Sequence, residues 1–251
     1  MNLERDGGKA SRVPVLAAEA SESQRRVGTQ RALHGRRRGR KLSEHRQFLV
    51  QTLLPRLALD ISRPISDIAS LFPERPSALW LEAGFGGGEH LAEEALAHPN
   101  AGYIGCEFFL NGIAKALALI EAHRLNNIRL CIGDARTLIE ALPPVCLDGA
   151  YVLFPDPWPK RRHRARRILS RETLDSLARA LRPGGELRFA TDVDANAAST
   201  LAQVLRSTSF RWTPSDANGW RVPWKGWNGT RYEAKALREG RQPVYLTFWR
   251  K

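Results

Sequence analysis

The sequence has no long hydrophobic segment. No stretch approaches the ~20 uncharged apolar residues that a membrane-spanning helix needs, and the first thirty residues carry too much charge to hold the apolar core of a signal peptide. We therefore expect a soluble, cytoplasmic protein that does not contact a membrane.

Cysteine is also scarce. Three cysteines, Cys106, Cys131 and Cys146, cannot all pair, and each lies in or beside an apolar run without C-x-x-C spacing. This pattern argues against a disulfide framework and against a zinc site. It predicts three small core residues and no bound metal.

Positive charge is abundant but unevenly distributed. The chain has 39 Lys and Arg against 26 Asp and Glu, a net charge of +13. Segment 42–157 carries −6, whereas 1–41, 158–167 and 168–251 carry +7, +6 and +6. Basic blocks around an acidic body indicate that defined surfaces bind a polyanion, for which nucleic acid is the obvious candidate. A solvated, disordered tail would also explain the basic run at 36–41.

The length of 251 residues suits one domain with a tail. Residues 1–40 are predicted to form a basic, largely disordered N-terminal tail, because most of this segment mixes Gly, Ser, Ala and charge without hydrophobic periodicity. Residues 41–251 are predicted to form the folded domain. Its first element is an amphipathic helix near 43–57, capped by Ser43 and broken around Pro55.

From residue 78 onward, apolar runs alternate with helical patterns. The predicted strands are 78–83, 101–106, 128–132, 148–154, 186–190 and 243–249, and the predicted helices are 87–97, 110–124, 135–141, 170–181 and 194–207. Pro183-Gly184-Gly185 is predicted to turn into the fifth strand. This alternation predicts an α/β, doubly wound, Rossmann-like fold with a mostly parallel sheet and an antiparallel C-terminal edge strand.

In such a sheet, ligands bind across the carboxyl ends of the strands. The first strand leads into Gly84-Phe85-Gly86-Gly87-Gly88, where Gly84 and Gly86 let the backbone approach a bound group. A G-x-G-x-x-G dinucleotide fingerprint would need glycine at Glu89. The spacing instead fits E-x-G-x-G-x-G, which places the Glu82 carboxylate where the amino end of S-adenosylmethionine would lie.

Two further acids follow the next two strands. Glu107 is positioned to accept hydrogen bonds from a ribose hydroxyl pair, and Asp134 from an adenine amino group. A nucleotide-binding fold whose acids only cap helices would explain the same residues without methyl transfer. Three acids at successive strand ends beside a glycine-rich turn favour S-adenosylmethionine.

The fourth strand leads into a loop with three prolines in five residues, Pro155, Pro157 and Pro159, which can continue neither a strand nor a helix. The loop presents Asp156 and Trp158, and segment 158–167 has six cations, as expected of a phosphate-binding surface. Alternatively, Trp158 is a core residue and the arginines form a solvated helix face.

Three segments together carry a family resemblance. Residues 82–88, the loop Phe154-Pro155-Asp156-Pro157-Trp158-Pro159-Lys160 with Arg162-His163, and Thr230-Arg231-Tyr232-Glu233-Ala234-Lys235 resemble the bacterial tRNA (guanine-N7-)-methyltransferase family, whose members use S-adenosylmethionine on a class I methyltransferase fold. The similarity runs from about Gly39 to the C-terminus. The family's usual isoleucine is replaced here by Ala83, a change that affects packing.

The resemblance implies a role for individual residues. Glu82, Gly84, Gly86, Glu107, Asp134 and Asp156 would bind or line the cofactor site, with Asp156 the catalytic residue. The residues that would hold the tRNA are Lys160, Arg161, Arg162, His163, Arg164, Asp192, Thr230, Arg231, Tyr232 and Glu233. It further implies methyl transfer to N7 of the guanine at position 46, in the variable loop, by a monomer or weak homodimer.

Two other functions fit the residues less well. A methyltransferase for another nucleic-acid or small-molecule nitrogen would share the proline after Asp156, but not the Trp-Pro-Lys that follows. A non-catalytic RNA-binding module on the same fold would not need acids at three strand ends.

Overall fold

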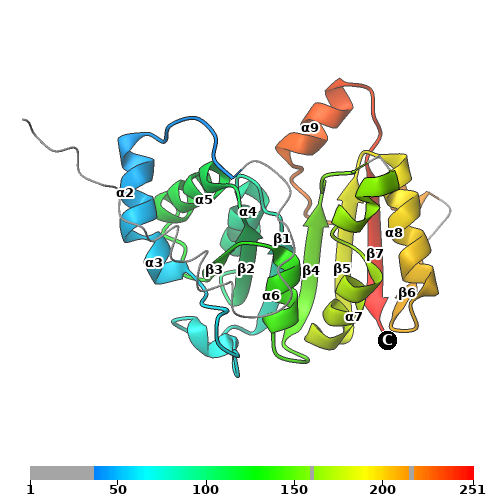
Figure 1. Ribbon diagram of the computed structural model, residues 1–251, viewed down its shortest axis with the longest axis horizontal. Helices are drawn as coiled ribbons and strands as arrows, with labels where there is room; N and C mark the ends of the chain where they lie inside the picture. Colours follow the sequence, from blue (N-terminus) through cyan, green and yellow to red (C-terminus); the bar gives the residue numbers. More distant parts are fainter. Residues whose placement is uncertain (1–36, 159–160, 215–217) are drawn as a thin grey trace, which may run out of the picture.

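The computed structural model describes residues 37–158, 161–214 and 218–251, in which a seven-stranded sheet lies between two layers of helices (Figure 1). The predicted tail therefore lies mostly outside the described residues. No helix in the described ranges is long and apolar enough to cross a membrane.

The sheet is mixed but mostly parallel. Its order is β3-β2-β1-β4-β5-β7-β6, with neighbouring strands parallel from β3 to β5 and antiparallel from β5 to β6. The strands are β1 Ala78–Ala83, β2 Ala101–Glu107, β3 Ile128–Ile132, β4 Leu147–Leu153, β5 Leu181–Thr191, β6 Phe210–Trp212 and β7 Val244–Arg250. Strand order reverses between β1 and β4, so the carboxyl ends of these two strands mark the expected ligand position.

Helices cover both faces of this sheet. They are α2 Glu44–Thr52, α3 Leu54–Leu57, α4 Glu89–Ala97, α5 Leu110–Ala122, α6 Ala135–Ala141, α7 Arg171–Ala180, α8 Asp194–Arg206 and α9 Arg231–Arg238, with 3₁₀ helices at Ala69–Leu71, Arg161–Arg166 and Gly219–Arg221. The apolar faces of α2, α3, α4 and α5 pack on β2 and β3 from one side. Those of α6, α7 and α8 pack on the other side, where Leu187 and Phe248 are fully buried.

Side-chain caps set several helix starts. The Ser43 hydroxyl accepts a hydrogen bond from the backbone N–H of Arg46 and begins α2, which ends before Pro55, as predicted. Ser170 caps α7 in the same way. Asp134, at the carboxyl end of β3, caps α6 through the N–H of Arg136.

The predicted strands and helices are confirmed from β1 to α8, with bounds shifted by one or two residues except at β5. Strand β5 begins earlier, at Leu181, and the predicted turn is a bulge inside it, where Gly184 has φ +77° and the pairing with β4 shifts register. The C-terminal strand β7 is antiparallel as predicted, but it is not the edge. The edge strand is β6, whose three residues are too few to give an alternating pattern.

The cysteines lie as expected. Cys106 and Cys131 are buried thiols within the main core, and half-buried Cys146 packs against its border. Burial and the neighbouring Cys131 raise the pKa of the Cys106 thiol, with the hydrogen bond between the two as the largest cause.

Candidate active site

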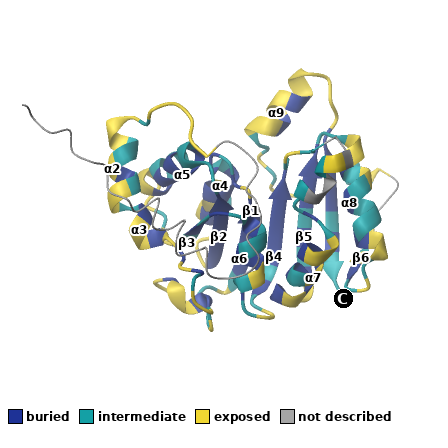
Figure 2. Cartoon of the chain, viewed as in Figure 1, coloured by how far each residue is buried: buried dark blue, intermediate teal, exposed yellow. Residues whose placement is uncertain are grey.

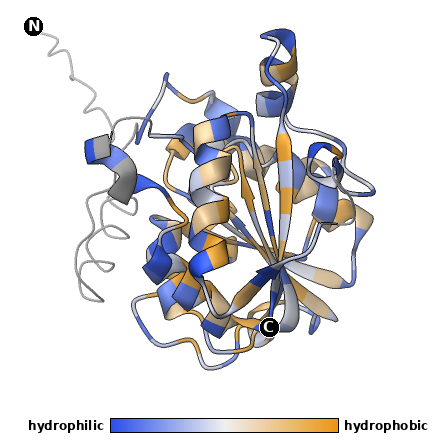
Figure 3. Ribbon diagram, turned by 90° about the vertical axis from the view of Figure 1, so that its right-hand side faces the viewer, coloured by the Kyte–Doolittle hydropathy of each residue, from blue (hydrophilic) through white to orange (hydrophobic). Residues whose placement is uncertain are grey.

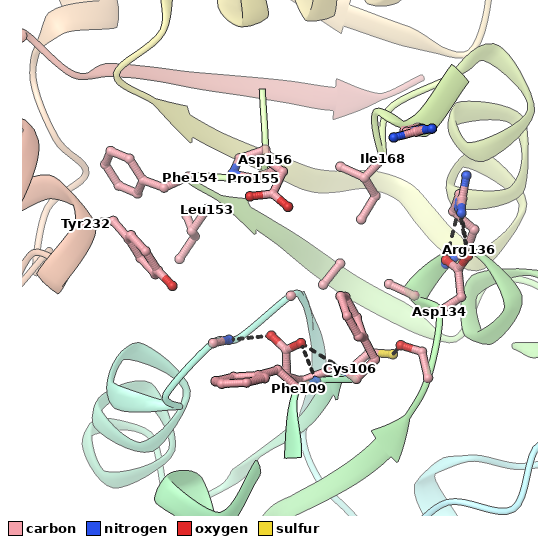
Figure 4. Close-up of a pocket in the computed structure, with 18 of the residues that line it drawn as sticks. Cys106, Phe109, Asp134, Arg136, Leu153, Phe154, Pro155, Asp156, Ile168 and Tyr232 are labelled. Carbon is pink, nitrogen blue, oxygen red and sulfur yellow. Dashed lines mark hydrogen bonds and ion pairs between the residues drawn. The ribbon is translucent and has the colours of Figure 1, made fainter. Parts of the chain in front are cut away.

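A cavity of about 420 Å³ lies at the carboxyl ends of β1 to β4, where the strand order reverses (Figure 4). In the close-up, Tyr232 and Asp156 border one part of the cavity, and Asp134 with Arg136 borders another. The lining residues are Ala83, Gly84, Gly86, Cys106, Glu107, Phe108, Phe109, Gly133, Asp134, Ala135, Arg136, Leu153, Phe154, Pro155, Asp156, Trp158, Arg166, Ile168, Arg231 and Tyr232.

The glycine-rich turn forms one wall. Gly84 and Gly86 have φ of +83° and +59°, which other residues rarely adopt, and the Gly84 N–H donates to the carbonyl of Cys106 at 2.8 Å. A side chain at Gly84 would meet no protein atom within 4 Å. At Gly112 on α5, a Cβ would lie 2.1 Å from the carbonyl oxygen of Gly86. The turn is therefore held from behind by α5 and open towards the cavity.

Glu107 ends β2 in a cradle of backbone donors. The N–H groups of Phe108 and Phe109 donate to Oε1 at 2.8 and 3.0 Å, and that of Gly86 donates to Oε2 at 2.9 Å. Burial raises the pKa of the Glu107 carboxyl, the three N–H groups oppose this rise, and the charge of Asp156 adds to it. The carboxylate is thus fixed in orientation, and Oε2 retains room for a second donor.

Asp134 lines the cavity but is already engaged. Arg136 donates to Oδ2 from Nη2 at 2.5 Å and to both carboxylate oxygens from Nε. The same pairing raises the pKa of the Arg136 guanidinium. Asp134 therefore both caps α6 and forms part of the cavity wall.

Glu82 lies behind the turn and is not among the residues that line the cavity. Its Oε2 is 2.9 Å from His90 Nδ1 on α4, and both side chains are buried. Burial is the largest influence and lowers the pKa of His90, but the charge and hydrogen bond of Glu82, together with the charges of Glu94 and Glu93, raise this pKa overall. The pair joins the end of β1 to the first turn of α4.

The loop after β4 holds Asp156 at the mouth of the cavity. Phe154 and Trp158 both have positive φ, at +46° and +42°, and Arg167 donates from Nε to the carbonyl of Pro157 at 2.9 Å. Asp156 is exposed and has no partner among the residues that the structure describes. Arg167 therefore holds the loop at Pro157, and the Asp156 carboxylate is open to a ligand.

The basic segment after this loop is only partly described. Lys160 lies outside the described residues, and the side chains of Arg161 and Arg164 are likewise not described. The Arg166 guanidinium lies 4.9 Å from the centre of the Trp158 ring, and the His163 ring meets that indole edge-on. Trp158 is half-buried and lines the cavity, so it is not a core residue.

The Thr230–Glu233 segment divides into two kinds of residue. Arg231 and Tyr232 line the cavity, and the Arg231 guanidinium donates to the Tyr232 hydroxyl at 3.0 Å. Thr230 and Glu233 instead form the capping box of α9, in which the Glu233 N–H donates to the Thr230 hydroxyl at 3.1 Å and Glu233 Oε2 accepts from the Thr230 N–H.

Asp192 stands apart from the cavity. Its Oδ2 accepts a hydrogen bond from Arg241 Nε at 2.7 Å, and it is not among the residues that line the cavity.

Three partners of these acids were not predicted from the sequence. Arg136, His90 and Arg241 each hold an acid that the sequence singles out. Only the pair of Asp134 with Arg136 could have been found from the sequence, because Arg136 follows Asp134 by two residues. The other two partners are eight and forty-nine residues from their acids, so only the folded chain reveals them.

Comparison with known proteins defines the class first. The family described as "Putative methyltransferase" matches residues 76–246, so the chain belongs to a family of methyltransferases. Its doubly wound sheet with antiparallel C-terminal strands is the class I methyltransferase fold. Membership implies the use of S-adenosylmethionine as methyl donor. PH0851, a solved structure with 16% identity and a TM-score of 0.52 over 69% of this chain and 42% of its own, shares the fold alone.

Curated relatives then define the particular family. A protein of Rhodopseudomonas palustris strain BisB5 is 50% identical over 225 residues, covering 89% of this chain and 88% of the relative. One of Nitrobacter hamburgensis is 47% identical over 239 residues, covering 94% and 93%. Both are named tRNA (guanine-N(7)-)-methyltransferase. The chain belongs to the tRNA (guanine-N7)-methyltransferase family.

Proposed function

We propose that this protein transfers a methyl group from S-adenosylmethionine to N7 of a guanine in tRNA, and that the target is the variable-loop guanine at position 46. The observation that carries the proposal is the single cavity in which the glycine turn, Glu107 and Asp156 meet, in a chain about half identical to relatives of that name.

The cavity suits the proposed cofactor. Its volume of about 420 Å³ is in the usual range for a small-molecule site. Glu107, with one free position on Oε2, would accept from a ribose hydroxyl, and Asp134 would border the adenine. The methionine end would lie along Gly84 and Gly86, with Glu82 supporting the turn through His90. Asp156 faces the remaining opening.

S-adenosylmethionine supplies an electrophilic methyl group on a sulfonium. Guanine N7 carries an in-plane lone pair and no proton at neutral pH, so no side chain has to remove one, and catalysis is mainly positioning. Positive charge develops on the purine as the bond to N7 forms. The negative charge of Asp156 would stabilise that charge, and its oxygens would accept from guanine N1–H and the 2-amino group.

Adenine offers no such pair of donors and would leave the carboxylate unpaired. Two other acids could in principle accept from guanine. Both carboxylate oxygens of Glu233 already accept hydrogen bonds, from Trp227 and Tyr245, and Asp192 pairs with Arg241. Asp156 is therefore the guanine-reading acid of the proposal.

The tRNA would lie over two basic surfaces that adjoin the cavity. One is the segment 161–166 after the Asp156 loop, of which Arg166 lines the cavity. The other is the basic run that begins at Arg37. Asn111, in the first turn of α5, holds this run in place: its side-chain oxygen accepts from the Gly39 N–H at 2.6 Å, and its NH₂ group donates to the Arg40 carbonyl at 2.7 Å. Phe109 of the cavity wall is next to this contact.

The test is nucleoside analysis of tRNA incubated with the protein and methyl-labelled S-adenosylmethionine. We expect labelled 7-methylguanosine, and none from a tRNA in which the variable-loop guanine is replaced by adenine. Label in a different nucleoside would support methylation of another nitrogen instead. Calorimetric binding of tRNA without binding of the cofactor would identify a non-catalytic RNA-binding module.

A further inference from the structure

Helix α9 projects beyond the carboxyl ends of the parallel strands (Figures 1 and 3), and Arg231 and Tyr232 in its first turn line the cavity. Most of its surface is exposed, as Figure 2 shows, and only Glu233 and Ala236 are buried. A helix of eight residues with two buried side chains has little apolar packing to fix its direction. Its placement must depend on specific contacts.

The buried carboxylate of Glu233 provides those contacts. Oε2 accepts from the indole N–H of Trp227 at 2.7 Å and from the Thr230 N–H at 3.1 Å, and Oε1 accepts from the Tyr245 hydroxyl. Tyr245 lies on β7, and the Trp227 ring packs against His90 of α4 at 5.1 Å between ring centres. Glu233 thus ties the start of α9 both to the sheet and to the element behind the glycine turn.

The opposite side of α9 carries a row of cations. Arg231, Lys235 and Arg238 follow one another at i, i+4 and i+7, so they share one face of the helix and extend over about 10 Å. Arg231 is at the cavity, and the other two lead away from it. Lys235 is 61% exposed with a weak pair to Glu239 at 3.9 Å, and Arg238 has no acidic partner in the described part of the chain.

We infer that this row, Arg231-Lys235-Arg238, binds the phosphate backbone of the tRNA next to the target nucleotide, and that Glu233 is a positioning residue for it. The inference rests on the proposed function and adds to it an RNA-binding surface on α9. It assigns Glu233 to the helix anchor, since three donors already occupy its oxygens and none comes from the cavity. Cations on an exposed face that starts at a substrate cavity fit a polyanion that enters the same cavity.

The first test reverses charge on the row. In Lys235→Glu/Arg238→Glu we expect the Michaelis constant for tRNA to rise at least tenfold and the slope of its salt dependence to flatten by roughly 1 to 2, because two phosphate contacts are lost. Cofactor affinity and the single-turnover rate at saturating tRNA should hold. The matched control is Arg206→Glu/Arg211→Glu, which makes the same charge change at the other end of the sheet.

If the α9 double variant and the control double variant alter the salt slope equally, only the net charge of the protein matters and the Arg231-Lys235-Arg238 row is not a binding site. An unchanged slope in the α9 pair would also overturn the inference. The wild type must form 7-methylguanosine in the same assay, so a failure of the proposed function is seen separately from a failure of the α9 row.

A second test addresses Glu233. Trp227→Phe removes one donor to Glu233 and leaves the carboxylate in place, whereas Glu233→Gln removes its charge. If Glu233 positions α9, both variants should raise the Michaelis constant for tRNA more than they change the single-turnover rate, and the effects should be less than additive in the double variant. If Glu233 instead binds guanine directly, Glu233→Gln should lower the single-turnover rate and Trp227→Phe should not, which would overturn the assignment.

Discussion

Acidic side chains around the cavity differ in what already occupies their oxygens. Glu82, Glu233 and Asp192 each pair with a side chain that does not line the cavity, namely His90, Trp227 and Arg241. Glu107 is held by backbone N–H groups, and Asp156 has no partner among the described residues. Because Glu107 Oε2 accepts only one of these N–H groups and Asp156 is exposed, these two carboxylates have capacity for a ligand, and we propose Glu107 for cofactor binding and Asp156 for the chemistry.

Replacing Asp156 by Asn tests the electrostatic role. The variant keeps size and some hydrogen bonding but removes the negative charge opposite the forming cation. We expect single-turnover methyl transfer to slow by roughly 10²–10³-fold, as for the loss of one preorganised group, with little change in tRNA binding or folding. Asp192→Asn is the contrast and should act through the Michaelis constant. A wild-type single-turnover rate in Asp156→Asn would make Asp156 merely a loop acid.

The raised pKa of Glu107 predicts how cofactor affinity depends on pH. Because burial moves this pKa upward, the carboxyl takes up its proton at a higher pH than an ordinary Glu. The protonated form is a poorer acceptor for ribose hydroxyls. Cofactor affinity measured by calorimetry should therefore fall as the pH is lowered, starting above the usual range of Glu.

Glu107→Gln cannot titrate, so it should bind the cofactor more weakly near neutral pH, by about 1–3 kcal/mol, and with a flatter pH profile. Parallel profiles for the variant and the wild type would show that another group is responsible for the pH dependence.

At the scale of elements, the turn between β1 and α4 depends on close packing with α5. Gly88 has φ +77°, and a Cβ there would lie 2.5 Å from Cβ of Ala116. Gly184, in the β5 bulge, has the same φ of +77°, but a Cβ there would meet nothing within 4 Å. The two glycines share this φ and differ in the space around a Cβ.

Gly88→Ala should therefore destabilise the protein more than Gly184→Ala. Backbone strain of about 1–2 kcal/mol is common to both, and the clash with α5 adds about 1–3 kcal/mol at Gly88 alone. Urea unfolding measures the difference. Equal losses of unfolding free energy would mean that α5 shifts freely, which would weaken the account of the turn as a rigid wall.

The whole molecule shows which features the sequence could predict. Hydrophobic periodicity and turn residues were sufficient to predict the parallel strands and the helices between them, because each of these elements has a local pattern of at least five residues. The three residues of β6 are too few for that signal, and α9 buries only Glu233 and Ala236, so it has no apolar stripe to recognise. The pairing of Glu82 with His90 and of Asp192 with Arg241 could not be predicted, since the residues around a strand end do not show which side chain folds against it.

The distribution of charge along the chain predicts how much the residues before the described segment contribute to tRNA binding. Residues 1–35 carry a net charge of only +2, whereas Arg36 to Lys41 carry five cations, four of which belong to the segment that Asn111 holds beside the cavity. Deleting residues 1–35 should thus leave the free energy of unfolding unchanged and weaken tRNA binding only modestly.

Reversing charge at Arg161, Arg164 and Arg166 should have a larger effect, because these cations follow directly on the Asp156 loop and the reversal changes the net charge by six. We expect the slope of log Kd against log salt to be nearly the same for the truncated and full-length proteins, and clearly flatter for the triple variant, with cofactor affinity equal in all three. A truncated protein that loses as much slope as the triple variant would show that the first 35 residues bind tRNA directly. An unchanged slope in the triple variant would instead show that the basic segment after the loop is a solvated face.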